Sequence, residues 1–330
     1  MRAITLILIV VSNLVVGINN QIKIIYNIVN PAEFISKLQN EEAWFAYQVK
    51  AQTNTKSMCC WQGADSEISQ CNLDSEKHSF GNRGEGLITE HINIYVSVAK
   101  GQVKKMISVG DQCEVLANGH EINWLNDVTQ ESSIKWLKKL SFDQKTHTAS
   151  TALYTLALHQ GKKASRALFD IAVMNNDINS ENAVFWLGEA RNDGVSHLQK
   201  LYKKLPKGQV KQHINFALSQ AQSLQGIAVL KEIAKKDQDS EQRADALFWL
   251  AQKNVKGVVQ ILMDAVKIDP SQAVKEKALF SLSQVKSEAA SDALFTLLKG
   301  DYSSQVKKQA LFWLSQSDNT DTIDRLQNLL

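Results

Sequence analysis

The hydrophobic pattern of the chain changes between its first part and the remainder. Residues 91–98 alternate apolar and polar side chains, and the runs 43–49, 58–61 and 103–109 have the composition of further short strands. Glycine and asparagine residues between these runs supply turns. After Trp124 the apolar residues follow helical spacing instead. The pattern predicts a mainly α fold, with a small β-rich domain over residues 18–128 before a helical domain over residues 129–330.

One helical segment recurs six times along the chain. Each copy has an aromatic residue in third place and leucine in fifth place, and consecutive copies start 31 or 32 residues apart. The copies begin at Ala152, Ala183, Ile214, Ala246, Ala278 and Ala310. A second amphipathic helix is expected between copies, over 226–236, 257–268 and 289–299. A period this regular predicts a stack of helix pairs in which each repeat contacts mainly its neighbours.

The later copies resemble a known family of repeats. Residues 306–316 read Val-Lys-Lys-Gln-Ala-Leu-Phe-Trp-Leu-Ser-Gln and are similar to the HEAT-like repeats common in bacteria, which also occur in phycobilin lyases. The resemblance covers roughly residues 131–330 and implies a right-handed α-solenoid. Because arrays of this family are mainly binding scaffolds, it implies a protein or peptide partner and no chemistry of its own.

The family also places an aspartate six residues before the basic residue of this segment. The chain keeps that spacing in the pairs Asp237/Arg243, Asp269/Lys275 and Asp301/Lys307, while the copies at Lys211 and Ser180 lack the aspartate. We expect each aspartate to pair with its own basic residue, rather than the basic column binding an acidic partner. Oxygen-bearing side chains precede three of these helices and are expected to cap them, namely Asp239, Ser271 and Ser303.

Aromatic and amide side chains recur four residues apart on one face of the segment. The candidate partner-binding residues are Phe185, Glu189, Phe216, Gln220, Phe248, Gln252, Phe280, Gln284, Phe312 and Gln316. At about 100° per residue, small residues are expected to face most directly away from the core, namely Gly188, Ser219, Ala251, Ser283 and Ser315. The aromatic and amide stripe is predicted to line the concave face of the solenoid. The alternative is that its phenylalanines pack sideways between repeats.

Four cysteines lie in the β-rich domain, at Cys59, Cys60, Cys71 and Cys113. A bond between the adjacent Cys59 and Cys60 would strain the backbone, and on a strand these two side chains point to opposite faces. We therefore expect one of them to bridge to Cys71 and the other to Cys113, and the spacing leaves the choice open. The spacing matches none of the paired cysteine patterns of zinc sites, so neither metal nor cofactor is predicted. Redox chemistry at Cys59 and Cys60, with the repeats as a substrate dock, is the alternative function.

The first residues are typical of a secretory signal. Arg2 is followed by an apolar run from Ile4 to Val16 that ends at Gly17, and this run is too short to span a bilayer. Residues 1–17 are predicted to be a signal peptide, with an uncleaved anchor or a buried strand as alternatives. Together with the cysteine-bearing domain, this start resembles uncharacterised exported bacterial proteins with HEAT repeats. We expect a periplasmic or secreted protein with no stable membrane insertion after signal removal.

The charge and the histidines narrow the function further. The net charge is +3, from 37 basic and 34 acidic residues, which provides no strong field for nucleic acid. The histidines are scattered, and no nucleophile stands at a usable spacing from a base. The sequence therefore predicts a non-catalytic scaffold of the cell envelope.

Overall fold

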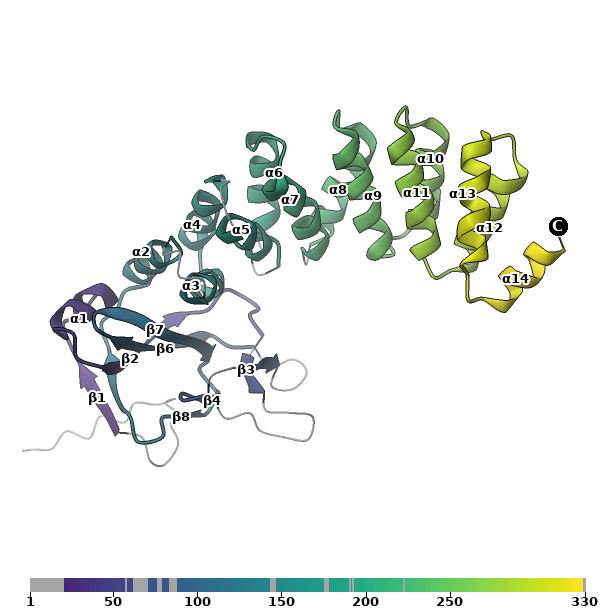
Figure 1. Ribbon diagram of the computed structural model, residues 1–330. Helices are drawn as coiled ribbons and strands as arrows, with labels where there is room; N and C mark the ends of the chain where they lie inside the picture. Colours follow the sequence, from purple (N-terminus) through teal and green to yellow (C-terminus); the bar gives the residue numbers. More distant parts are fainter. Residues whose placement is uncertain are drawn as a thin grey trace, which may run out of the picture. The chain divides into compact units, whose positions relative to one another are not determined.

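The computed structural model describes residues 21–56, 58–61, 71–75, 79–82, 88–142, 147–174, 178–189, 191, 193–221 and 223–328 (Figure 1). The predicted signal peptide lies outside these residues. The chain divides into two compact units, residues 1–171 and 172–330. The unit that holds the sheet therefore extends beyond residue 128, where the sequence changes from strand to helix. No helix among the described residues has both the length and the apolar content needed to cross a membrane.

The first unit combines a sheet with helices. Its elements are β1 (Gln21–Ile25), α1 (Pro31–Lys37), β2 (Ala43–Lys50), β3 (Met58–Trp61), β4 (Cys71–Asn72), β5 (Ser79–Asn82), β6 (His91–Ala99), β7 (Gln102–Gly110), β8 (Val115–Leu116), β9 (Glu121–Leu125), α2 (Gln130–Leu140), α3 (His147–Leu158) and α4 (Lys162–Val173), near whose end the division falls. The main sheet has the strand order β1-β9-β2-β6-β7. β9 runs parallel to β1 and β2, whereas β6 is antiparallel to β2 and β7. The turn between β6 and β7 lies at Lys100 and Gly101, both with positive φ.

The two faces of the sheet bury different partners. Phe45 and Tyr47 of β2 face the helices, and their rings lie 6.1 and 6.3 Å from Trp136 of α2. Trp44 and Ala46 point the other way because side chains alternate along a strand, and they join a buried cluster with the four cysteines. Both faces of the sheet are therefore buried, and this unit has a hydrophobic core of its own.

Buried polar contacts connect the sheet to α2 and α3. The Tyr47 hydroxyl lies 2.9 Å from Ser133 Oγ, which lies 2.8 Å from His159 Nε2 just beyond α3. Ser108 of β7 also contacts Thr155 of α3, with 2.6 Å between their hydroxyl oxygens. α3 holds the first copy of the repeated segment, so this copy packs against the sheet within the first unit.

The second unit consists of successive helices (Figure 1). They are α5 (Ile178–Glu189), α6 (Gly194–Lys204), α7 (Gln209–Gln220), α8 (Leu224–Lys236), α9 (Ser240–Gln252), α10 (Val258–Ile268), α11 (Gln272–Gln284), α12 (Glu288–Lys299), α13 (Ser304–Ser315) and α14 (Thr320–Gln327). The segment copies lie on α5, α7, α9, α11 and α13, which we call the inner helices. The intervening helices α8, α10 and α12 begin within two residues of their predicted starts. The solenoid preceded by a β domain is therefore confirmed.

Caps and leucines explain the regularity of the stack. Asp239 and Ser303 accept hydrogen bonds from the first turns of α9 and α13, as predicted, while Ser271 stands at the cap of α11 without a side-chain bond. The leucine in fifth place is almost fully buried in each inner helix: Leu187, Leu218, Leu250, Leu282 and Leu314. Burial of one such side chain contributes about 1.5–3 kcal/mol, so the same position anchors every repeat.

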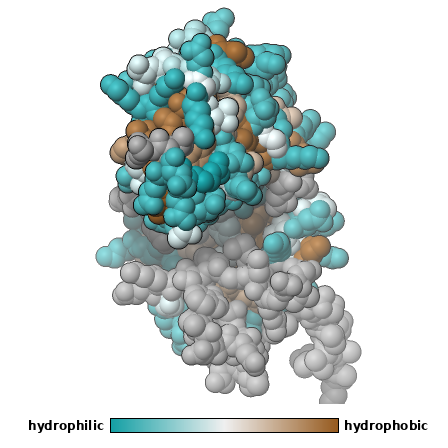
Figure 2. Space-filling view, turned by 90° about the vertical axis from the view of Figure 1, so that its right-hand side faces the viewer, coloured by the Kyte–Doolittle hydropathy of each residue, from teal (hydrophilic) through white to brown (hydrophobic). Residues whose placement is uncertain are grey.

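The last helix closes the described part of the stack. α14 is mostly polar, and its Arg325 lies 2.8 Å from Asp292 of α12. Figure 2 looks onto this C-terminal end, where hydrophilic side chains surround a few apolar ones.

Candidate functional site

The aromatic residues of the inner helices form one continuous series of ring contacts, which we call the aromatic ladder. Its members are Phe185, Trp186, Phe216, Phe248, Trp249, Phe280, Phe312 and Trp313. Phe185 stacks on Phe216 at 5.9 Å, and Phe248 stacks on Phe280 at 6.1 Å. Trp249 joins the two stacks because its ring lies 4.7 Å from Phe216 and 5.0 Å from Phe248. The five predicted phenylalanines are thus brought together across the repeats.

These phenylalanines pack sideways and still reach the surface. Four of them are half-buried, and Phe312 at the end of the ladder is 52% exposed. The sideways packing explains why an aromatic residue recurs in every repeat. The exposed part of each ring remains available to a partner. Sideways packing between repeats and partner binding can therefore both apply to the same phenylalanines.

The predicted amide residues lie beside the ladder. Gln252, Gln284 and Gln316 are exposed, whereas Glu189 and Gln220 are half-buried. In two repeats the glutamine Nε2 donates to the preceding serine: Gln220 to Ser219 at 3.1 Å, and Gln284 to Ser283 at 3.2 Å. These serine hydroxyls donate in turn to the carbonyl oxygens of Phe216 and Phe280. The contact fixes the orientation of each amide, and Gln220 Oε1 in turn accepts a hydrogen bond from Lys253 Nζ at 3.0 Å.

The small residues of the segment do not face away from the core, contrary to expectation. Gly188, Ser219 and Ala251 are buried, and only Ser315 at the end of the stack is exposed. A Cβ at Gly188 would lie 2.3 Å from the backbone oxygen of Ala217 on the next inner helix. These positions are small because neighbouring inner helices approach each other there. A projection of a single helix shows which residues face the core but does not include the neighbouring inner helix.

Sequence reasoning missed a polar column one position before the start of each copy. It consists of Asn182, His213, Asp245, Lys277 and Gln309, all half-buried. Lys277 Nζ lies 4.9 Å from the ring centre of Phe248 and 5.3 Å from that of Phe280, while His213 lies 3.4 Å from Glu181. Burial raises the pKa of Asp245, although a hydrogen bond from Asn215 opposes the shift. The alignment that revealed the phenylalanines also contains this column, whose side chains differ between repeats.

Two buried polar side chains interrupt the apolar core between α7 and α9. Asn215 and Gln242 occupy places where later repeats have leucine and valine, and both are fully buried. Asn215 Nδ2 lies 3.2 Å from Gln242 Oε1 and 3.0 Å from Asp245 Oδ2. Asn215 Oδ1 and Gln242 Nε2 have no hydrogen-bond partner among the described residues.

The aspartate and basic residues pair differently from the prediction. Arg243 does not bind the carboxylate of Asp237 but donates to its backbone oxygen at 2.7 Å. Its Nε and Nη2 donate to both oxygens of Asp269 in the next repeat, at 2.7 and 2.9 Å. Burial opposes ionisation of Asp269, but hydrogen bonds from Arg243 and the Ser271 N–H outweigh it and lower its pKa. Asp269 thus binds the basic residue of the preceding repeat, and this contact links the two neighbours.

The cysteines form two disulfides in the first unit. Cys59 pairs with Cys113, with 5.4 Å between their Cα atoms, and Cys60 pairs with Cys71, with 4.9 Å. All four are at most 2% exposed. Buried disulfides are poorly placed for attack by an external thiolate, so this arrangement suits a structural role. The described residues contain no group of three or more side chains arranged to hold a metal ion.

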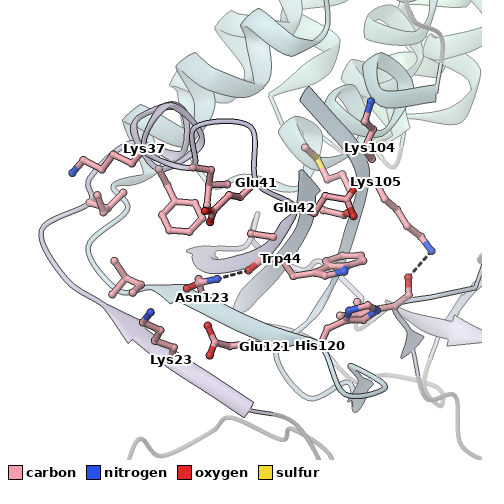
Figure 3. Close-up of a pocket in the computed structure, with 18 of the residues that line it drawn as sticks. Lys23, Lys37, Glu41, Glu42, Trp44, Lys104, Lys105, His120, Glu121 and Asn123 are labelled. Atoms are coloured by element: carbon pink, nitrogen blue, oxygen red, sulfur yellow. Dashed lines mark hydrogen bonds between the residues drawn. The ribbon is translucent and has the colours of Figure 1, made fainter. Parts of the chain in front are cut away.

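The first unit has a cleft of about 1390 Å³ (Figure 3). Lysine and glutamate side chains line it, with Trp44 in the middle and His120 beside it in the close-up. Many of these charges are occupied: Lys105 donates to the Leu73 oxygen at 2.6 Å, and His120 lies 2.7 Å from Asp74. Hydrogen bonds from Asn118 and His120 lower the pKa of Asp74. The cleft therefore has mixed charge and no arrangement of nucleophile and base among its described lining residues.

Comparison with known proteins agrees with this geometry. Residues 227–312 match the sequence profile of HEAT repeats. No curated protein matches the sequence.

Three solved structures are similar to this chain at low identity. Human deoxyhypusine hydroxylase in complex with glycerol is 13% identical with a TM-score of 0.28, over 61% of this chain and 95% of that chain. An engineered protein is 18% identical with a TM-score of 0.29, over 59% and 61%. The CpcE and CpcF complex of phycocyanin lyase from Nostoc is 17% identical with a TM-score of 0.29, over 60% and 81%. At these TM-scores the likenesses carry no argument about activity.

Proposed function

We propose that this HEAT-repeat protein is a non-catalytic scaffold of the cell envelope that binds a protein or peptide along the aromatic ladder. The observation that carries the proposal is the continuity of the ladder over the inner helices, with exposed glutamines beside it. Half-buried rings with fixed neighbours suit binding, since their side-chain entropy is already lost. Aromatic residues also contribute disproportionately to binding energy at protein interfaces.

The two disulfides favour an exported protein, because such bonds persist in oxidising compartments. The signal-like start of the sequence supports the same location. The alternative, redox chemistry at the cysteines, is disfavoured by the burial of all four sulfurs. A thiol titration of the native chain under mild reductant distinguishes the two: the scaffold requires both bonds to persist, and a labile Cys59 or Cys60 supports the redox function.

A peptide selection tests the binding site. Dodecapeptides selected from a displayed library on the folded full-length chain are expected to protect the inner helices in hydrogen–deuterium exchange. Substitution of Phe248 or Phe280 by alanine is expected to lower the affinity for these peptides about tenfold, equivalent to about 1.4 kcal/mol. Ile268→Ala is the matched control, since this apolar side chain is 75% exposed on α10, outside the ladder. The assignment fails if folded Phe248→Ala and Phe280→Ala variants bind as well as the control.

A further inference from the structure

The two phenylalanine stacks of the ladder have nearly the same geometry. Phe185 and Phe216 lie 5.9 Å apart with 13° between their planes, and Phe248 and Phe280 lie 6.1 Å apart with 11°. Each stack joins adjacent inner helices, α5 with α7 and α9 with α11. Any group that binds one stack well therefore fits the shape of the other.

The chain itself places a cation on the second stack. Lys277 Nζ lies within 6 Å of both ring centres, the range in which the negative face of an aromatic ring attracts an ammonium group. Lys277 belongs to the polar column of the segment, one position before Ala278. It thus shows which chemistry a phenylalanine stack of this geometry accommodates.

The first stack has a different residue at the equivalent place. His213, one position before Ile214, lies 3.4 Å from Glu181 Oε2, and no cation–ring contact is seen at Phe185 or Phe216 among the described residues. The rings are half-buried, so part of their surface is accessible. The first stack therefore has the geometry that binds Lys277 elsewhere, without a lysine of its own.

The charges at the two ends of the ladder differ in sign. α5 carries Glu181 and Glu189, four residues before and after Phe185, and no basic residue. α13 at the other end carries Lys307 and Lys308 and no acidic residue. Residues four apart on a helix lie on one face, so Phe185 shares one face of α5 with both glutamates, and Glu181 also lies 3.4 Å from His213. A cation is favoured at the α5 end and disfavoured at the α13 end.

We propose that the stack of Phe185 and Phe216, with Glu181 and Glu189 on either side, binds a basic side chain of the partner. The inference rests on the proposed binding function and specifies the partner's chemistry: a lysine or arginine seated at the α5 end of the ladder. The ring faces attract the cation, and the two carboxylates select it over a neutral side chain.

A single-arginine peptide tests this in the full-length chain. The probe is a capped pentapeptide with one central arginine between glycines, and its matched control has glutamine in the centre. With ¹³C-labelled phenylalanine, the arginine peptide is expected to shift the ring resonances of Phe185 and Phe216 and to bind about fivefold more tightly than the glutamine peptide. Equal binding of the two peptides, or unmoved rings, overturns the proposal.

Two reciprocal substitutions use the internal comparison. His213→Lys places the chain's own ammonium group beside the first stack, as Lys277 does at the second, and is expected to abolish the shifts at Phe185 and Phe216. Lys277→Gln uncovers the second stack, where the arginine peptide is then expected to shift Phe248 and Phe280. If folded His213→Lys binds the peptide like the parent chain, the assignment is wrong.

The outcome is separable from the proposed function. Library peptides that bind the ladder without any preference for a basic residue would leave the scaffold function intact and refute the cation site. Conversely, an arginine peptide that binds the first stack while no library peptide uses the inner helices would support the cation site and refute the scaffold function.

Discussion

Arg243 of one repeat binds Asp269 of the next through two hydrogen bonds, at 2.7 and 2.9 Å. The same guanidinium donates to the backbone oxygens of Asp237 and Gln238, so its position is fixed from both sides. Planar, paired donors make arginine suited to this contact, which lysine cannot reproduce. The contact joins the turns of two neighbouring repeats.

Asp269→Asn is expected to lower the free energy of unfolding of the helical unit by about 3 kcal/mol at pH 7, because it leaves Arg243 buried beside a neutral group. The pKa of Asp269 is depressed in the folded state, so its contribution is present above the unfolded pKa, near 4, and is lost as the pH falls through the folded value. Urea denaturation of the parent protein and of Asp269→Asn between pH 7 and pH 2 measures the difference in their free energies of unfolding. A difference that stays constant with pH contradicts the assignment.

Gly188→Ala is expected to destabilise the second unit by about 1–3 kcal/mol, because its Cβ would overlap the Ala217 backbone, which cannot move without displacing α7. Ser315→Ala is the control, since it occupies the same place in the last inner helix and is exposed. Thermal unfolding followed by circular dichroism compares the two. Equal melting temperatures would show that the inner helices are not closely apposed at Gly188.

Ser133→Ala is expected to cost about 1–3 kcal/mol in the first unit, because the Tyr47 hydroxyl and His159 lose the group that joins them. The double variant with Tyr47→Phe is expected to recover part of this loss, since it removes the buried hydroxyl as well as its partner. Denaturant titrations of the single and double variants form the test. A double variant less stable than Ser133→Ala would argue against the contact.

Asp245→Asn is expected to raise the stability of the free protein at neutral pH. Burial raises the pKa of this carboxyl above its unfolded value, so ionisation costs folding free energy that grows as the pH rises through the two values. The gain should therefore vanish in acid, as the loss caused by Asp269→Asn also does, and the two substitutions differ in the sign of their effect at neutral pH. Unfolding midpoints at pH 7 and pH 3 provide the comparison, and a gain at both values would point to a cause other than charge.

Removal of a disulfide is expected to lower the free energy of unfolding by more when the bond closes a longer loop. The Cys59–Cys113 bond spans 54 residues and the Cys60–Cys71 bond spans 11, so chain entropy assigns them about 4 and 3 kcal/mol. Paired serine substitutions, one bond at a time, measure each loss by chemical denaturation of the first unit. A larger loss for the short loop would show that packing of the sulfurs outweighs chain entropy.

The sequence predicted what repeats and what alternates. Six copies of one segment defined the helix pairs, and their caps at Asp239 and Ser303 set where the helices begin. The cysteine spacing reduced the pairings but did not choose between them, because adjacent residues on a strand differ only in the face they point to. That choice depends on which side of β3 Cys71 and Cys113 lie.

Contacts between repeats were less accessible to sequence reasoning. The Arg243 and Asp269 pair crosses a repeat boundary, whereas the motif suggested a pair within one turn. The buried position of Gly188 followed from a neighbouring helix that a single-helix projection does not include. The cleft around Trp44 and His120 combines residues from separate strands and helices, and no local pattern in the chain joins them.

The amide pair of Asn215 and Gln242 has a mechanical consequence. Every other inner-helix junction is closed at these positions by at least one aliphatic side chain, whereas this one holds two polar groups with one unmatched atom each. Under force, the junction with the least favourable packing is expected to separate first. Pulling the two ends of the protein apart should therefore separate α7 from α9 first. Helices α9 to α13 should stay together, because Arg243 and Asp269 join the repeats at the start of this part.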